Sequence, residues 1–176
     1  DETKLSDHVA VMMVGVAYQQ SAIPLLWRAY SVQDYPVEGQ VGLLNGLLDQ
    51  LRALIPPDQA LLLLADRGLG TSPTWQAHLS ETGWPYLLRV QRSTRIRLPN
   101  HKPQPLRHLV AYGQTWTGRG QVFKKAGWQW KWVYLVWEVG FAEPMCLFSN
   151  QPDLAPHLYA RRFYHEASFR DLKSDG

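Results

Sequence analysis

Charged residues gather at helical spacing near the end of the chain, in the segment YARRFYHEASFRDLK. Arg162 and Arg170 lie four residues before and after Glu166, and Tyr159 and Lys173 lie seven residues before and after it. At about 3.6 residues per turn, these side chains form one stripe of a predicted helix. Ion pairs on an exposed helix would produce the same stripe. The excess of cations around one carboxylate also suits a further anion, such as a metal-bound phosphate.

Two other segments hold acidic residues that could join this carboxylate in a metal site. Asp66 ends the apolar run ALLLLAD, where a carboxylate is costly without a metal or a partner. The alternative is a turn Asp that bonds the backbone of Arg67–Gly68. The N-terminal segment DETKLSD offers Asp1, Glu2 and Asp7. A strand interrupted just after an acid favours Asp1, with Asp7 as the alternative. Three carboxylates from separate elements can hold two Mg²⁺ ions for phosphoryl transfer.

The composition indicates one folded domain. Hydrophobic residues make up 45% of the 176 residues, which is enough for a core and argues against disorder. No apolar run is long enough to span a bilayer. The single cysteine, Cys146, excludes an internal disulfide and a zinc site built on several thiolates, and it suits a reducing compartment. We expect this thiol to be buried, and the six His residues to be structural or on the surface.

The net charge of +3 indicates polyanion binding only weakly, but the placement of the basic residues is more informative. A first group is Arg89, Arg92, Arg95, Arg97, Lys102 and Arg107, and a second is Arg119, Lys124, Lys125 and Lys131. A solvated basic surface would explain either group taken alone. Within the first group, the residues from Arg89 to Arg97 also suit a channel for DNA.

Periodicity and turn residues predict an α/β chain with a mixed sheet and helices on its faces. Pro24 predicts that the second strand is an edge strand or has a break near its start. The first predicted elements are strands over 9–20 and 21–30, a helix over 41–55 ended by Pro56–Pro57, and a strand over 60–66 buried on both faces. A helix over 73–83, capped by Thr71 or Ser72, and a strand over 84–91 follow. The chain then has β-like runs at 94–98, 108–112, 114–125, 128–140 and 143–150, and ends with a helix over 153–173 that has Asp153 as its cap and Pro156 in its first turn.

Several of these features together resemble a known family. The spacing of Tyr159, Arg162, Glu166 and Lys173 resembles the Tyr-Arg-Glu-Lys signature of bacterial insertion-sequence transposases with a DDE catalytic triad. The segments LLLADRG and DETKLSD resemble those that carry the family's second and first Asp, and SAIPLLWR resembles another typical segment. The resemblance implies a ribonuclease-H-like fold over 1–176, with its first strand truncated. It also implies a β-rich insertion subdomain at 93–150, before the last helix.

The resemblance further implies a site and a reaction. Asp1, Asp66 and Glu166 would be catalytic and would bind two Mg²⁺ ions, with Mn²⁺ able to substitute. The phosphodiester at a transposon end would be hydrolysed, and the released 3′-hydroxyl would attack a second strand. The expected partners are double-stranded DNA, as transposon ends and target, and a second copy of the chain on paired ends. The implied location is the bacterial cytoplasm, at the nucleoid when bound, with no membrane.

The same resemblance assigns DNA contacts. Tyr159, Arg162 and Lys173 would hold phosphates beside the cleaved end, and we expect Arg170, Arg89 and Arg92 to contact DNA as well. By strand alternation, Trp128, Trp130 and Trp132 share one face, where sheet packing explains most of them. Some family members stack an extruded base on an aromatic residue of the insertion, and Trp116, in a turn-like segment, or Trp132 could do so here.

Other interpretations stay open. The chain begins at Asp1 and stops soon after Lys173, so we expect an excised domain or a truncated reading frame. The alternatives to a transposase domain are a nuclease of the same fold without strand transfer and an inactive DNA-binding remnant. A β-rich adaptor with a basic surface is a third alternative, in which Asp66 and Glu166 would lie far apart.

Overall fold

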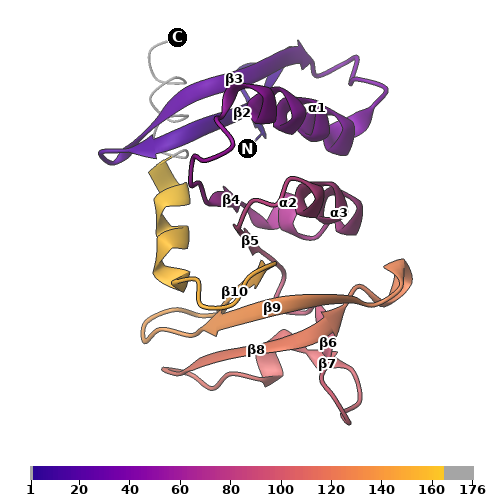
Figure 1. Ribbon diagram of the computed structural model, residues 1–176, viewed down its shortest axis with the longest axis vertical. Helices are drawn as coiled ribbons and strands as arrows, with labels where there is room; N and C mark the ends of the chain where they lie inside the picture. Colours follow the sequence, from indigo (N-terminus) through magenta and orange to yellow (C-terminus); the bar gives the residue numbers. More distant parts are fainter. Residues whose placement is uncertain (1, 165–176) are drawn as a thin grey trace. The chain divides into compact units, whose positions relative to one another are not determined.

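The computed structural model describes residues 2–164, which fall into two units, each with its own sheet. The described part of the first unit comprises residues 2–60 and 159–164. The second unit comprises Leu61–Leu158. Figure 1 labels the elements of both units along the chain. The predicted α/β class is therefore confirmed at the level of a mixed sheet with a few helices.

The first unit holds a three-stranded antiparallel sheet and one long helix. The strands are β1 (Glu2–Lys4), β2 (Val9–Tyr18) and β3 (Ser21–Ser31), in the order β1-β2-β3, and the helix is α1 (Gly39–Leu54). Between β2 and β3, Gln19 and Gln20 have φ values of 42° and 68°, as a tight hairpin turn requires. This turn lies where the sequence predicted it.

Pro24 disturbs the second strand as predicted. β3 is an edge strand of its sheet and has no partner strand on its outer side, so a proline without an N–H is tolerated there. The register also shifts here, because Val14 pairs with Leu26 whereas Gly15 pairs with Pro24. The strand therefore carries a bulge at Leu25.

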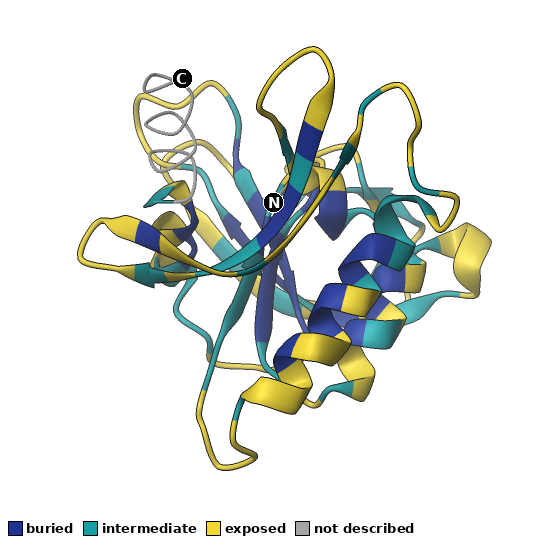
Figure 2. Cartoon of the chain, turned by 90° about the horizontal axis from the view of Figure 1, so that it is seen from above, coloured by how far each residue is buried: buried dark blue, intermediate teal, exposed yellow. Residues whose placement is uncertain are grey.

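Helix α1 contacts β2 and β3 through one apolar stripe. Its buried residues are Leu43, Leu44, Leu47, Leu48 and Leu51, which recur at the three- and four-residue spacing of an amphipathic helix. Figure 2 shows buried and exposed residues alternating along the helix. The helix ends at Leu54, just before the predicted stop at Pro56–Pro57.

The second unit is built on a seven-stranded mixed sheet in the order β4-β5-β10-β9-β8-β6-β7. Two helices, α2 (Arg67–Gly70) and α3 (Pro73–Glu81), connect the parallel strands β4 and β5. The strands are β4 (Leu63–Ala65), β5 (Tyr86–Arg89), β6 (Arg95–Arg97), β7 (Gln104–Pro105), β8 (Thr115–Val122), β9 (Gln129–Val136) and β10 (Met145–Ser149), with short 3₁₀ helices η1 (Leu106–His108) and η2 (Lys124–Ala126).

The β-rich segment 93–150 continues the sheet that begins with β4 and β5. Its last strand, β10, pairs antiparallel with β5 and with β9. One face of these strands forms a core cluster that includes Ile96, Val133 and Phe148. Segment 93–150 therefore adds strands and core to a shared sheet, and its role as an insertion stays a prediction.

Two strand predictions in this unit were wrong. The run 60–66 forms only the three residues of β4, and within 61–65 only Ala65 is buried, because β4 is the end strand of its sheet. The run 108–112 forms no strand. Leu106, in the adjacent 3₁₀ helix, and Val110, in the loop that follows, both insert into the core cluster. These apolar side chains therefore attach the loop to the core and do not form a strand.

The last described segment also differs from its prediction. Helical structure begins at Pro156 as a 3₁₀ helix, η3 (Pro156–Arg162), whereas Asp153 lies in the preceding loop with a φ of 61°. The fixed φ of proline suits the first helical position, so the helix begins at Pro156 and Asp153 does not cap it. Among the helices within residues 2–164, none is long and apolar enough to cross a membrane.

Candidate functional site

Asp66 lies at the carboxyl end of β4 and caps the helix that follows. Its Oδ1 accepts a hydrogen bond from the backbone N–H of Leu69 at 3.2 Å, and its carbonyl accepts from Gly70 at 2.8 Å. Because Ala65 pairs with Leu88 in parallel register, Asp66 stands beside the end of β5. The carboxylate is half-buried and offers hard oxygen donors at a strand end, where ligands of α/β sheets bind.

Close packing fixes this strand end. A Cβ on Gly70 would lie 2.0 Å from the carbonyl oxygen of Arg89, so α2 rests directly on the backbone of β5. The buried side chain of Gln76 donates from Nε2 to the Gly70 carbonyl at 2.5 Å. The helix that Asp66 caps is therefore held against β5 by a glycine contact and by a buried hydrogen bond.

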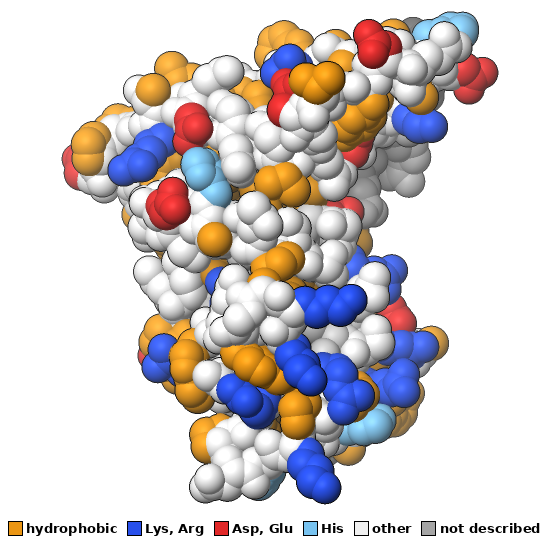
Figure 3. All heavy atoms as spheres, turned by 90° about the vertical axis from the view of Figure 1, so that its right-hand side faces the viewer, with side chains coloured by type: hydrophobic (Ala, Val, Ile, Leu, Met, Phe, Trp, Pro, Cys, Tyr) orange, Lys and Arg blue, Asp and Glu red, His pale blue; other side chains and the backbone are white. Residues whose placement is uncertain are grey.

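Three arginines of the second unit converge on one carboxylate, Glu143, in the loop before β10. Arg67 Nη1 lies 3.3 Å from Oε1, Arg89 Nη2 lies 3.8 Å from Oε1, and Arg92 Nε lies 3.3 Å from Oε2. We call these four residues the Glu143 cluster. Figure 3 shows one face of the molecule, on which Lys and Arg side chains gather in the lower half of the view, over the second unit.

Sequence reasoning named Arg89 and Arg92 but missed the other two members of the cluster. Glu143 and Arg67 are 76 residues apart, and the pairing of β10 with β5 brings them together. The one sequence signal for Arg67 is that it directly follows Asp66 at the end of the predicted strand.

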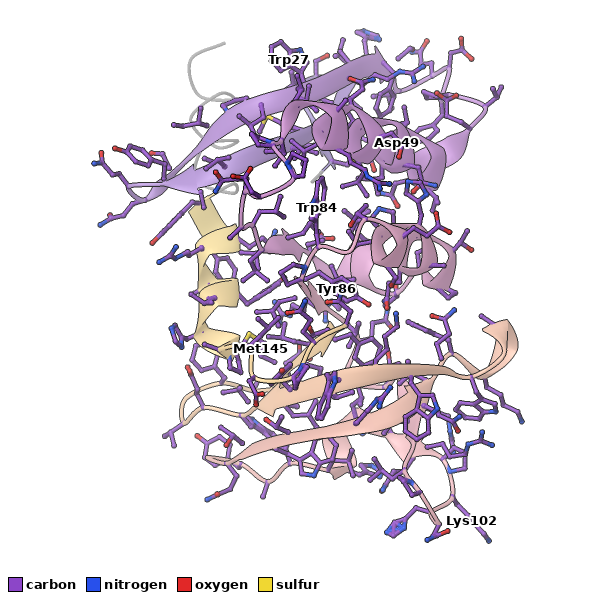
Figure 4. All side chains as sticks on the ribbon, in the orientation of Figure 1. Trp27, Asp49, Trp84, Tyr86, Lys102 and Met145 are labelled. Atoms are coloured by element: carbon purple, nitrogen blue, oxygen red, sulfur yellow. The ribbon has the colours of Figure 1, made fainter. Side chains whose placement is uncertain are left out.

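A second group of cations, from β6 and β8, stacks on tryptophans at the start of β9 and just before it. The guanidinium of Arg97 lies 4.4 Å from the ring centre of Trp128, and that of Arg119 lies 5.3 Å from Trp130. Arg97 also donates to the side chain of Gln121. Beside these residues, the loop from β6 to β7 borders a hollow of about 660 Å³, and Lys102 lies near the end of that loop (Figure 4).

The tryptophan prediction was partly wrong. Trp130 and Trp132 lie on one face of β9, as alternation requires. In the ladder between β8 and β9, Trp132 stands opposite Arg119. Trp128 precedes the strand and has a φ of 57°, so alternation does not apply to it. Trp116 lies in β8 and packs against the core cluster, with its ring across Gly118. Base stacking by Trp116 or Trp132 stays a prediction.

Tyr159 and Arg162, predicted to hold DNA phosphates, are both buried. They are three residues apart in η3, where a 3₁₀ helix places such residues on one side. The guanidinium of Arg162 lies 5.8 Å from the ring centre of Tyr159 and 5.1 Å from that of Phe163. In the described part of the chain these side chains therefore contribute to packing, and their contact with DNA stays a prediction.

The remaining predicted site residues lie near the two ends of the chain. Asp1, Glu166, Arg170 and Lys173 lie outside the described residues. Asp7 is exposed in the bend between β1 and β2, as a turn residue would be. Within residues 2–164, no three His, Cys, Asp or Glu side chains are grouped to hold a metal ion.

Glu2 is engaged in hydrogen bonds within the first unit. Its carboxylate accepts from the hydroxyls of Tyr30 and Tyr35, and Gln40 donates to Oε2 at 2.6 Å. Burial, followed by the bond to this carboxylate, raises the pKa of Tyr30. Glu2 thus ties the short strand β1 to β3 and to the start of α1.

Two buried groups in the second unit have shifted pKa values. Lys131, expected on a basic surface, is only 6% exposed, and its Nζ donates to the hydroxyl of Tyr86 at 2.8 Å. Burial lowers the pKa of Lys131 to about 8 and raises the pKa of Tyr86 to about 12. Figure 4 labels Tyr86 in β5. Burial, with a smaller effect of Glu143, raises the pKa of the Cys146 thiol to about 12, and this thiol is buried as expected.

In comparisons with known proteins, neither a protein-family model nor a curated protein matches this chain.

Proposed function

We propose that this chain is the catalytic domain of a DDE transposase with a ribonuclease-H-like fold. Its substrate is double-stranded DNA, and its reaction is phosphodiester cleavage followed by strand transfer from the released 3′-hydroxyl. The observation that carries the proposal is the position of Asp66, a carboxylate at the end of β4 that stands beside β5 and is followed directly by a cationic residue. The spacing from Tyr159 to Lys173 supports the same assignment.

In this proposal, the acidic residues divide between metal binding and positioning. Mg²⁺ held by Asp1, Asp66 and Glu166 would neutralise charge on the phosphate and orient the attacking oxygen. Asp66 suits a metal because it offers a hard oxygen donor whose position is fixed by the cap to Leu69 and by the contact of α2 with β5. Arg89 and Arg92 hold the DNA backbone near this strand end, as guanidinium forks do with phosphate oxygens.

Substitution of Asp66 by Asn tests the proposal. Asn caps helices as well as Asp does, so D66N keeps the bond to Leu69 and removes only the charge. We expect Mg²⁺-dependent cleavage to fall by more than about a hundredfold, because loss of a mere supporting group at a metal site costs about 10- to 100-fold. DNA binding should be retained. The measurement uses a labelled duplex that copies one end of the transposable element encoding the chain, followed by gel electrophoresis.

The matched control is D58N, which removes the same charge from an exposed loop residue. Cleavage by D66N at the rate of D58N would refute the assignment of Asp66. A second substrate, pre-cut with a free 3′-hydroxyl, tests strand transfer into a plasmid. Hydrolysis without joined product would instead indicate a nuclease of the same fold. The same experiment on E166Q tests the third acid.

A further inference from the structure

The Glu143 cluster holds more positive charge than its single carboxylate can balance. Three guanidiniums, from α2, from β5 and from the turn after β5, surround one carboxylate. The N–O distances of 3.3 to 3.8 Å exceed the roughly 2.8 Å of a close charge-assisted hydrogen bond. Of the three pairs, the contact of Arg67 has the geometry of a hydrogen bond. The carboxylate is therefore loosely held.

A phosphate group would match the same three side chains better. It is tetrahedral and presents several oxygens, whereas a carboxylate presents two in one plane. Arginine forks bind phosphate oxygens in pairs. The side chains of Arg67 and Arg92 are 49% and 45% exposed, and that of Glu143 is 33% exposed, so an anion from solution can reach them.

We propose that Arg67, Arg89 and Arg92 form a phosphate-binding site in which Glu143 takes the place of the phosphate until a ligand displaces it. The proposal rests on the proposed function for the source of the phosphate, which is the DNA backbone. Binding requires Glu143 to leave the three guanidiniums, so this residue lowers the affinity for DNA and discriminates against weakly charged ligands.

The test compares E143Q with E138Q in the full chain. Glu138 lies in the same loop and is exposed, and its substitution removes the same charge. Binding of a labelled duplex is measured by fluorescence anisotropy at several salt concentrations, with EDTA present so that no cleavage occurs. We expect E143Q to bind about two- to fivefold more tightly than E138Q, which is the range that loss of exposed ion pairs provides. Equal affinities would overturn the proposal.

Substitution of an arginine gives an independent measurement that does not require E143Q to fold. We expect R92Q to bind the duplex more weakly and to reduce the slope of log K against log salt by about 0.9, because one phosphate contact is lost. R107Q, which changes an exposed arginine outside the cluster, is the control. An unchanged slope in R92Q would also contradict the site.

Inorganic phosphate separates the two sources of ligand. If phosphate alone raises the melting temperature of E143Q more than chloride does at equal ionic strength, and no duplex binds, the anion site stands and the DNA proposal fails. If Mg²⁺-dependent cleavage persists while E143Q and E138Q bind DNA equally, the proposed function stands and Glu143 has only a structural role.

Discussion

Asp66 is held in place by contacts within its own segment of the chain. It caps α2 with one oxygen, which holds its side chain in a single orientation at the end of β4. A cap of this kind contributes about 1 kcal/mol to stability. The Gly68 backbone approaches so closely that an added Cβ would lie 3.3 Å from Oδ1. The side chain is thus positioned before any ligand arrives.

Lys131 makes stability depend on pH. Its pKa falls from an ordinary 10.5 to about 8 on folding, so between these values the unfolded chain binds more protons and stability rises with pH. We expect K131M to be more stable than the wild type at pH 7, by up to about 3 kcal/mol, and this advantage to shrink as pH rises from 8 to 10. Urea unfolding of both proteins across this range measures the effect.

The comparison with K131M is needed because other groups titrate in the same range. Tyr86, whose pKa is raised to about 12, lowers stability as pH rises above 10, since the folded state then keeps a proton that the unfolded state loses. If the difference in the free energy of unfolding between K131M and the wild type is the same at every pH, Lys131 does not cause the pH dependence.

At the scale of elements, the contact between α2 and β5 decides where the strand end is held. We expect G70A to destabilise the second unit by about 3 kcal/mol, because the new methyl group would overlap the Arg89 carbonyl. The control is G46A in α1, where an added Cβ meets nothing within 4 Å and alanine should stabilise the helix by up to about 1 kcal/mol. Urea unfolding followed by circular dichroism measures both. Equal effects would show that α2 tolerates displacement.

Local signals predicted several elements well. The Ser72–Pro73 pair starts α3 as expected, with the Ser72 hydroxyl accepting from Trp75, because a cap acts within one turn of the helix. The run 60–66 was harder to predict. A short apolar run reads as a strand buried on both faces, but burial depends on which strands flank it, and β4 has a neighbour on one side of its sheet.

At the scale of the whole molecule, the single cysteine reports opening of the seven-stranded sheet. Cys146 is 1% exposed, and its pKa is raised from 9.0 to about 12. At pH 8 we expect alkylation of the native protein to be at least about a thousandfold slower than in concentrated guanidinium chloride, since thiolate is the reactive form. Mass spectrometry after timed additions of iodoacetamide measures the rates. Rapid labelling of the folded protein would show that β10 opens readily.

The distribution of charge also depended on the complete fold. The basic residues between Arg89 and Lys131 fall into two groups in the sequence, and each group taken alone suggests a solvated surface. The structure separates them, because Arg92 lies at the Glu143 cluster, Arg97 lies against Trp128, and Lys131 is buried. Alternation along strands sends neighbouring side chains to opposite faces, so basic residues close together in sequence can differ in burial and in the groups they contact.

Local residue patterns predicted the β2–β3 hairpin, the apolar stripe and the end of α1, and the start of α3. Each depends on residues within a few positions of one another, where backbone sterics and apolar periodicity act directly. The contact of Glu143 with three arginines and the burial of Lys131 against the hydroxyl of Tyr86 arise only in the folded chain. Both follow from the order β5-β10-β9, which joins segments distant along the chain by hydrogen bonds that no local pattern specifies.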